Sequence, residues 1–451
     1  MDIEGGGGDG GAHTVTEHEN LGSRLQGACA GICVGLLLFL GSFPLLFWNE
    51  GRAVDRYDAL NEAKGQTFSI LDPTAPPDPA NEGKLLHFSA NTTNGGDALI
   101  DATFGIESSS VECLTLRRNA EMYQWIERVE TTSKKKVGGG KTTTKTYTYH
   151  KEWVDGLIDS NMFQQPDNHV NPSSMEFESM QVTANPISIG AYELPRELVH
   201  RINWETRMGV EIADISNESI RKRAKIDNLE LYFGNSVFNP QIGDQTVSFA
   251  EAMPSVVTIV GVQSGNTLAP FVSQSGEGGK ILLFQQGTHS AKSMYEGAEG
   301  ENAVLTWVLR LVGFVAMTLG LYLIFQPVEV FADIVPCVGS IVGCGIIFVS
   351  VLISAVLSAI TISFSWLVAH PTIGAIVLGV MFAVIGCCAF GVKQLEGRKG
   401  KEEDHSLPST HPGRVAAEIL PTAYPIPIAK AVHAPEPTIL YTAPEPYVPG
   451  T

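Results

Sequence analysis

Five histidines lie in the long polar stretch of the chain, and histidine often binds a metal ion or transfers a proton near neutral pH. None of them falls in the His-Glu-x-x-His pattern that sets two metal ligands on one helix face. The sequence also lacks the Gly-x-Ser-x-Gly turn of a serine nucleophile and the Gly-x-x-x-x-Gly-Lys-Ser/Thr loop that cradles a phosphate. Isolated histidines are mostly surface groups, so we predict no catalytic residue, no cofactor and no metal site. The five are His87, His150, His169, His200 and His289.

Long apolar segments are the main structural elements that the sequence predicts. A bilayer core is about 30 Å thick, and a helix needs about 20 apolar residues to cross it. The segment near the N-terminus follows acidic residues and lacks a small-residue cleavage site, so we predict a retained span rather than a signal peptide. The sequence therefore predicts a multi-pass α-helical membrane protein with four spans, at residues 27–48, 303–326, 341–368 and 372–392.

Basic residues just after the last span predict its orientation, because cytoplasmic loops are enriched in Lys and Arg. These residues are Lys393, Arg398, Lys399 and Lys401. Four spans put both chain ends in the cytoplasm, so residues 49–302 are predicted to be lumenal and residues 327–340 to form a cytoplasmic loop. Asn91 and Asn217 each begin a glycosylation acceptor tripeptide, which favours a lumenal face.

The predicted lumenal region, residues 49–302, has the pattern of a strand-rich α+β domain. Aromatic residues alternate with polar ones around Trp125 and around Tyr149, which is typical of two strands, and a glycine-rich stretch at 138–140 between them indicates a hairpin loop. We predict a helix from Pro195 through Ile202 and another at residues 290–302. Further strands are predicted at residues 85–90, 98–106, 229–233, 246–249, 256–262 and 281–284.

Polar and small residues near the spans allow two interpretations each. Asn49, Glu50, Gly51 and Arg52 follow the first span, either as an interfacial turn or as a junction that fixes the domain against the bilayer. Arg310 has no obvious acidic partner, so we expect its long side chain to reach the headgroups. Four-residue spacing puts three glycines on one helix face, which indicates close helix packing or ordinary glycine usage in a membrane helix. These are Gly27, Gly31 and Gly35.

Composition limits the remaining possibilities. The 451 residues carry a net charge of −18, which argues against nucleic-acid binding, because phosphate contacts need a basic face. Of seven cysteines, Cys113 alone lies in residues 49–302, so no disulfide forms within that region. Residues 1–26 are predicted to be a disordered acidic, Gly-rich tail, and residues 393–451 a basic and then Pro-rich disordered cytoplasmic tail.

An ordered set of short motifs resembles the LUMA family, also called transmembrane protein 43. The motifs include Asn49-Glu50-Gly51-Arg52-Ala53, Glu121-Met122-Tyr123-Gln124-Trp125, Gln286-Gly287-Thr288-His289-Ser290-Ala291 and Thr306-Trp307-Val308-Leu309-Arg310. The resemblance covers about residues 21–400 and favours the junction interpretation of residues 49–52. It implies a protein of the endoplasmic reticulum and nuclear inner membrane that forms homo-oligomers and associates with lamins and emerin. It assigns no catalytic activity.

These observations predict a non-enzymatic membrane scaffold that helps to organise the nuclear envelope. Its expected partners are the lipid bilayer, further copies of itself and other nuclear-envelope membrane proteins, with lamin- or emerin-type partners only where the organism has them. A channel or transporter subunit is the alternative, since ionisable groups within spans often mark ion paths. A lumenal enzyme with an unrecognised site is a third hypothesis, which a pocket of converging titratable groups would support.

Overall fold

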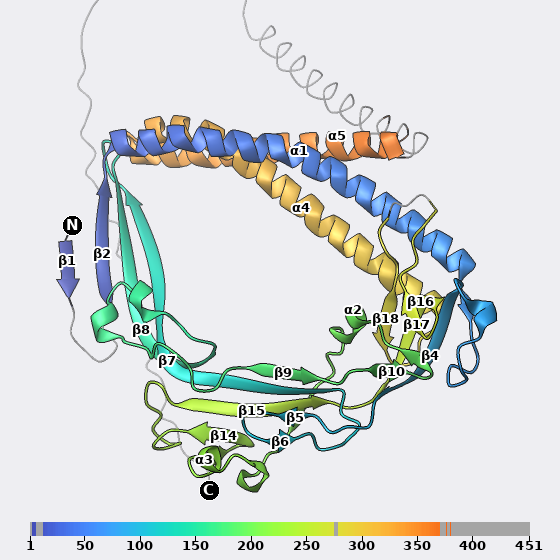
Figure 1. Ribbon diagram of the computed structural model, residues 1–451. Helices are drawn as coiled ribbons and strands as arrows, with labels where there is room; N and C mark the ends of the chain where they lie inside the picture. The colour runs from blue at the N-terminus through green and yellow to red at the C-terminus, as the bar shows by residue number, and fades with distance from the viewer. Residues whose placement is uncertain (1, 6–11, 275–277, 370–375, 377–378, 380–451) are drawn as a thin grey trace, which may run out of the picture. The chain divides into compact units, whose positions relative to one another are not determined.

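The computed structural model describes residues 2–5, 12–274, 278–369, 376 and 379, which all lie in one compact unit, Met1–Val384 (Figure 1). Its long helices are α1 (Leu21–Gln66), α4 (Ala291–Ala332) and α5 (Pro336–Ala369). All three are long and apolar enough to cross a membrane. They contain three of the four predicted spans, and the fourth, at 372–392, lies outside the described residues.

Each helix begins before its predicted span, and α1 also continues well past it. The side chain of Asn20 accepts a hydrogen bond from the Ser23 amide at 2.8 Å and so starts α1 at Leu21. Ser290 caps α4 in the same way, and the predicted helix at residues 290–302 is confirmed as the first part of α4. The polar parts of α1 and α4, residues 49–66 and 291–302, carry the helices from the apolar segments to the strand-rich domain (Figure 1).

Glycines bring α1 and α4 into close contact. A Cβ atom on Gly35 would lie 2.8 Å from the carbonyl oxygen of Gly320, and one on Gly320 would lie 2.6 Å from the Phe39 nitrogen. Gly31 also faces α4, with Gln326 Oε1 at 3.4 Å. A Cβ on Gly27 would meet no atom within 4 Å, so Gly27 is not part of this contact. The glycine face therefore packs against another helix of the same chain.

The larger sheet contains nine strands in the order β1-β2-β8-β7-β15-β14-β13, with β9 paired to β7 and β12 to β15. The predicted hairpin is confirmed as β7 and β8, which pair from Glu121 with Asp155 to Lys135 with Lys141. The strands are β1 (Asp2–Gly5), β2 (His13–Glu19), β7 (Thr115–Lys135), β8 (Lys141–Asp155), β9 (Met180–Thr183), β12 (Thr206–Met208), β13 (Lys225–Asp227), β14 (Glu230–Phe233) and β15 (Gln245–Ala252).

The prediction of a disordered tail over residues 1–26 is wrong for the described residues, because β1 pairs with β2 and α1 begins at Leu21. His13–Glu19 pairs antiparallel with β8, His13 opposite Tyr147 and Glu19 opposite Lys141. His13 and Val15 are buried, whereas Thr14 and Thr16 are more exposed, as expected for a strand with one covered face. The glycine-rich composition concealed this alternation.

The second sheet contains seven strands in the order β18-β16-β17-β11-β10-β4-β3. The predicted strands at 85–90, 229–233, 246–249, 256–262 and 281–284 are confirmed in substance, but 98–106 forms only the two-residue strands β5 (Ile100–Asp101) and β6 (Ile106–Glu107). The helix predicted from Pro195 is the single turn α2 (Arg196–Val199), and α3 (Glu218–Arg221) is equally short. The strands are β3 (Phe68–Ser69), β4 (Leu85–Asn94), β10 (Ile187–Ile189), β11 (Tyr192–Glu193), β16 (Val256–Ser264), β17 (Thr267–Ala269) and β18 (Leu283–Gln286).

Two buried clusters hold these elements together. The larger joins both sheets and includes Phe104, Phe177 and Phe249, whose rings lie 4.9 to 5.6 Å apart around Phe104. The smaller cluster packs Leu60 of α1 and Tyr295 of α4 against the second sheet. Burial of these apolar side chains fixes the polar parts of α1 and α4 on the strand-rich domain.

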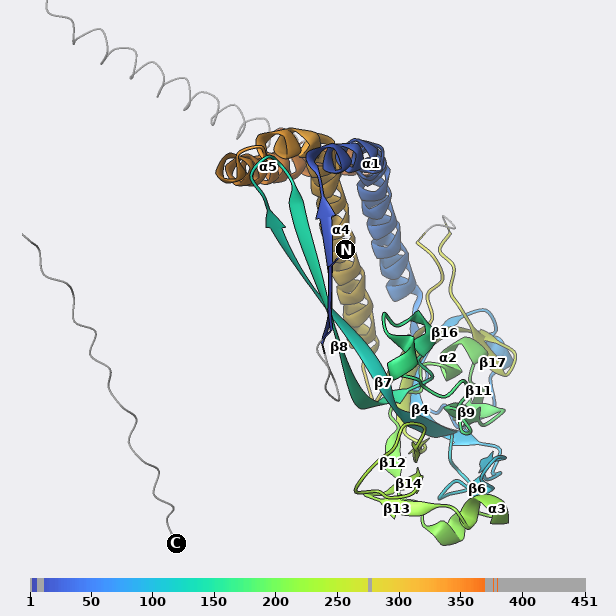
Figure 2. The ribbon, with the colours of Figure 1, turned by 90° about the vertical axis from the view of Figure 1, so that its left-hand side faces the viewer.

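The tip of the β7–β8 hairpin contacts the first turn of α1 and the turn between α4 and α5 (Figures 1 and 2). Lys135 Nζ lies 2.8 Å from Glu329 and 2.9 Å from Asp333, and Gly138 donates its amide hydrogen bond to the Ile334 carbonyl. The predicted topology puts these segments on opposite sides of a membrane. A polar hairpin with open edges does not cross lipid, so this structure does not support that separation.

Candidate membrane-junction site

A buried ion pair joins α1 and α4 just beyond the first apolar segment. Arg310 donates two hydrogen bonds to the Glu50 carboxylate, from Nε at 2.7 Å and from Nη2 at 2.6 Å. The Nε1 group of Trp366, on α5, donates a third at 2.8 Å. Glu50 is 1% exposed, and Arg310 also lies over the Trp307 ring. The expectation that Arg310 has no acidic partner is therefore wrong.

The neighbouring motif residues extend the same contact between helices. Asn49, which is fully buried, donates to the Thr306 carbonyl at 3.1 Å. Arg52 donates to Asn302 at 2.9 Å and to the Thr306 hydroxyl at 3.0 Å, and Asn302 returns a hydrogen bond to the Ala53 carbonyl. Residues 49–52 are therefore helical and form a junction between α1 and α4 rather than an interfacial turn.

Gly51 has no special role in this geometry. It lies inside the helix, and a Cβ there would meet no atom within 4 Å. In an interfacial turn this glycine would supply backbone freedom, which a regular helix does not need. The three polar side chains of the motif, and not the glycine, make the junction.

A second polar cluster lies at the hairpin tip. Arg24 donates to Asp333 at 2.6 Å and to the Gly139 carbonyl at 2.6 Å, and Asp333 is fully buried. Burial alone would raise the pKa of Asp333, but hydrogen bonds from Arg24 and Lys135 lower it below its usual value. For Lys135, burial alone would lower the pKa, but the hydrogen bonds to Glu329 and Asp333 raise it above its usual value. This cluster was not foreseen from the sequence.

Of the five histidines, His169 is buried and His200 is exposed, and the other three are half-buried. His169 is 6% exposed and stacks on the Tyr149 ring at 3.7 Å between centroids, which corrects the expectation for this residue. His87 Nε2 donates a hydrogen bond to the His289 carbonyl oxygen at 2.9 Å. Within the described residues, no three His, Cys, Asp or Glu side chains gather in a way that could hold a metal ion.

The remaining predicted residues fall in three places. Asn91, in β4, and Asn217, before α3, are both exposed on the strand-rich domain. The Asn217 side chain also accepts a hydrogen bond from the Ser219 amide. The basic residues predicted to anchor the topology lie outside the described residues, as does the Pro-rich tail.

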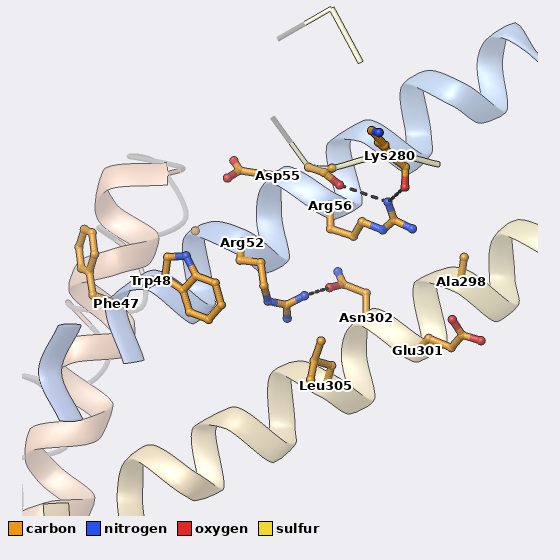
Figure 3. Close-up of a pocket in the computed structure, with 13 residues that line it drawn as sticks. Phe47, Trp48, Arg52, Asp55, Arg56, Lys280, Ala298, Glu301, Asn302 and Leu305 are labelled. Atoms are coloured by element: carbon orange, nitrogen blue, oxygen red, sulfur yellow. Dashed lines mark hydrogen bonds between the residues drawn. The ribbon is translucent and has the colours of Figure 1, made fainter. Parts of the chain in front are cut away.

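A pocket of about 730 Å³ opens beside the junction (Figure 3). Arg52 and Arg56 of α1 line it, together with Glu301 and Asn302 of α4 and Lys280, which precedes β18. Arg56 Nη1 donates to the carbonyl oxygens of Gly278 and Lys280, at 3.2 and 2.8 Å. These bonds hold residues 278–280 against α1 at the edge of the pocket.

Three long apolar helices joined to a strand-rich domain through buried polar contacts define an integral membrane protein. Comparison with known proteins identifies its family. The transmembrane protein 43 profile matches residues 122–371. The chain belongs to the transmembrane protein 43 family.

Curated relatives cover most of both chains. Mouse transmembrane protein 43 is 31% identical over 81% of this chain and 89% of its own. The human protein is 30% identical over 80% and 90%, and the Drosophila melanogaster homolog 30% over 76% and 90%. No solved structure gives a significant match.

Proposed function

We propose that this protein is a non-enzymatic scaffold of the endoplasmic reticulum and nuclear inner membranes. Its strand-rich domain binds other membrane proteins of the nuclear envelope, and its helices form homo-oligomers. The observation that supports this role is the buried contact of Glu50 with Arg310 and Trp366, because it fastens three membrane helices to one another. Such a rigid base suits a domain that positions partners.

The same contact favours the scaffold over a channel or transporter. An ionisable side chain that serves an ion path must exchange partners with the solute. Arg310 instead donates its Nε and Nη2 hydrogen bonds to Glu50, which has almost no exposed surface. Proteoliposomes of the full chain should show no ion or solute flux above that of empty vesicles. Flux that Glu50→Gln alters would favour the channel.

The location of the protein is proposed from its family resemblance, together with the apolar helices that support a membrane protein. We place the strand-rich domain in the lumen, since both acceptor asparagines, Asn91 and Asn217, are exposed on it. Glycosidase treatment of the protein expressed in cells should then change its mobility, and Asn91→Gln with Asn217→Gln should abolish the change. Residence in other membranes, seen by fluorescence microscopy after selective permeabilisation, would contradict the location.

The hairpin contacts add a requirement to this topology. If the strand-rich domain is lumenal, the turn that Lys135 and Gly138 contact has to lie on the same side. A membrane-impermeant maleimide tests this on Ile334→Cys, which is 48% exposed, with the unsubstituted chain as background. Labelling of the Ile334→Cys variant from the side opposite the glycans would show that the hairpin does not contact the turn when the protein is in a membrane.

Partner binding and self-association have separate tests. The full chain in native detergent should elute as an oligomer, and proximity labelling from the strand-rich domain should mark nuclear-envelope membrane proteins. A monomer at all concentrations would refute the oligomer. Labelling that matches a soluble lumenal control would refute the scaffold role.

A further inference from the structure

The pocket beside the junction has an excess of cationic side chains at the edge of the apolar helices (Figure 3). Arg52, Arg56 and Lys280 line it, against the carboxylates Asp55 and Glu301. Phe47 and Trp48 line the same pocket from the last turn of the apolar part of α1. Trp48 is 57% exposed, as is typical of a tryptophan at a membrane surface.

Several donors in this pocket are unused. Arg52 Nε is buried and has no hydrogen-bond partner among the described residues. Arg56 forms its hydrogen bonds to the chain through Nη1. In the part of the chain that the structure describes, which omits residues 275–277, Lys280 Nζ forms neither a hydrogen bond nor an ion pair, and the residue is exposed. An anion with several oxygen atoms could accept from all three side chains.

A second, apolar cavity lies between α1 and α5. It has a volume of about 640 Å³ and is lined by Phe43, Pro44, Phe47, Trp48, Ile360, Thr361 and Phe364. Phe47 and Trp48 line both cavities, so the cationic and apolar spaces adjoin at these two side chains. The adjoining spaces suit a molecule with a negative head and an apolar tail.

We infer that the two cavities bind an anionic phospholipid, with its phosphate among Arg52, Arg56 and Lys280 and an acyl chain between α1 and α5. A phosphate monoester, as in phosphatidic acid, offers the highest charge and the most acceptor oxygens to these donors. A choline-capped headgroup brings its own cation against Lys280 and is disfavoured. The lipid would bind beside the junction of α1 and α4, and this inference does not depend on the proposed scaffold role.

Native mass spectrometry of the full chain in detergent tests the lipid site. The probes are phosphatidic acid and phosphatidylcholine with identical acyl chains, each added at increasing concentration. The wild-type chain should bind phosphatidic acid about tenfold more tightly, which corresponds to about 1.4 kcal/mol. Lys280→Glu should remove that preference, and Lys280→Gln should reduce it. The matched control is Lys222→Glu, an equal charge change at an exposed residue of the strand-rich domain, which should leave the preference unchanged.

Equal retention of the two lipids would overturn the inference. An identical effect of Lys280→Glu and Lys222→Glu would also overturn it. Inorganic phosphate distinguishes a headgroup from a free ion, because it lacks the tail. If millimolar phosphate alone competes with phosphatidic acid and Ile360→Trp, which fills the apolar cavity, leaves lipid binding intact, the site takes free phosphate and the lipid assignment fails. Loss of lipid binding in Ile360→Trp with unchanged folding supports the assignment.

Discussion

The contact between Glu50 and Arg310 gives the sharpest test of how the membrane helices are held. Glu50→Leu leaves the Arg310 guanidinium without its carboxylate, and Arg310→Leu leaves a carboxylate that is 1% exposed without its cation. Breaking a buried pair in this way typically costs about 3–5 kcal/mol, because the remaining charge stays away from water. Each single variant should therefore lose about 3–5 kcal/mol of stability against unfolding.

The double variant separates the ion pair from its individual side chains. Glu50→Leu with Arg310→Leu leaves no unpaired charge, and apolar replacement of a buried pair is often nearly neutral. The double variant should cost no more than one single variant, so the coupling between the two residues should exceed about 3 kcal/mol. Equilibrium unfolding in mixed micelles, followed by circular dichroism, measures all three variants.

A matched control lies on the same helix. Lys292 and Glu296 form an exposed pair on α4, with side chains 76% and 57% exposed, and removing it should change stability by less than about 0.5 kcal/mol. Additive costs in the double variant, or a loss at Glu50 no larger than in this control, would refute the reasoning. Either result would mean that the ion pair itself does not hold the two helices together.

Three further predictions concern other parts of the described chain. Gly320→Leu should destabilise the packing of α1 on α4 by at least about 1–3 kcal/mol, because a Cβ there lies 2.6 Å from the backbone of α1. Gly41→Leu should not, because a Cβ at Gly41 meets no atom within 4 Å. Thermal unfolding in detergent compares the two variants. Cys113 is fully buried, and its burial raises its pKa to about 11. Iodoacetamide at pH 8 should therefore alkylate it only in unfolded protein. Mass spectrometry that finds the alkylated Cys113 peptide in folded protein would contradict this prediction. The lowered pKa of Asp333 means that its contribution is complete above the unfolded value of about 3.9 and is lost as pH falls through the lower folded value. Hydrogen exchange at the Gly138 amide should therefore stay slow from pH 5 to 8 after correction for intrinsic rates, and an increase in that range would contradict the ion pairs.

Local patterns were enough to predict most of the elements but not their partners. Alternation around Trp125 and Tyr149 gave the β7–β8 hairpin, because the strand period is visible in a few residues. The apolar segments gave three helices in the same way. The length of the strand predicted at 98–106 was overestimated, because a turn at residues 102–105 divides it into two paired two-residue strands. Phe104 and Ile106 are fully buried there, whereas Ile100 is 48% exposed.

The polar contacts of the site depend on long-range pairing, which no single segment reveals. Glu50 and Arg310 are 260 residues apart, and Lys135 and Asp333 are 198 apart. A usable signal existed for the first pair. Glu50 lies just beyond the end of one span and Arg310 just inside the start of the next, so antiparallel packing brings opposite charges to a similar depth. No comparable signal joined Lys135 to Asp333, because charge-based topology assigned them to different sides.

The two polar clusters fix α1 at points well separated along the helix. Arg24 and Glu50 are 26 residues apart, which is about 39 Å along the helix at 1.5 Å per residue. Glu50 binds α4 and α5, while Arg24 binds the hairpin tip and Asp333. Since the strand-rich domain includes that hairpin and also packs on Leu60, it contacts α1 near both of its ends. Rotation of α1 about its own axis would therefore break buried ion pairs at both places, so these contacts set the orientation of the strand-rich domain to the helix.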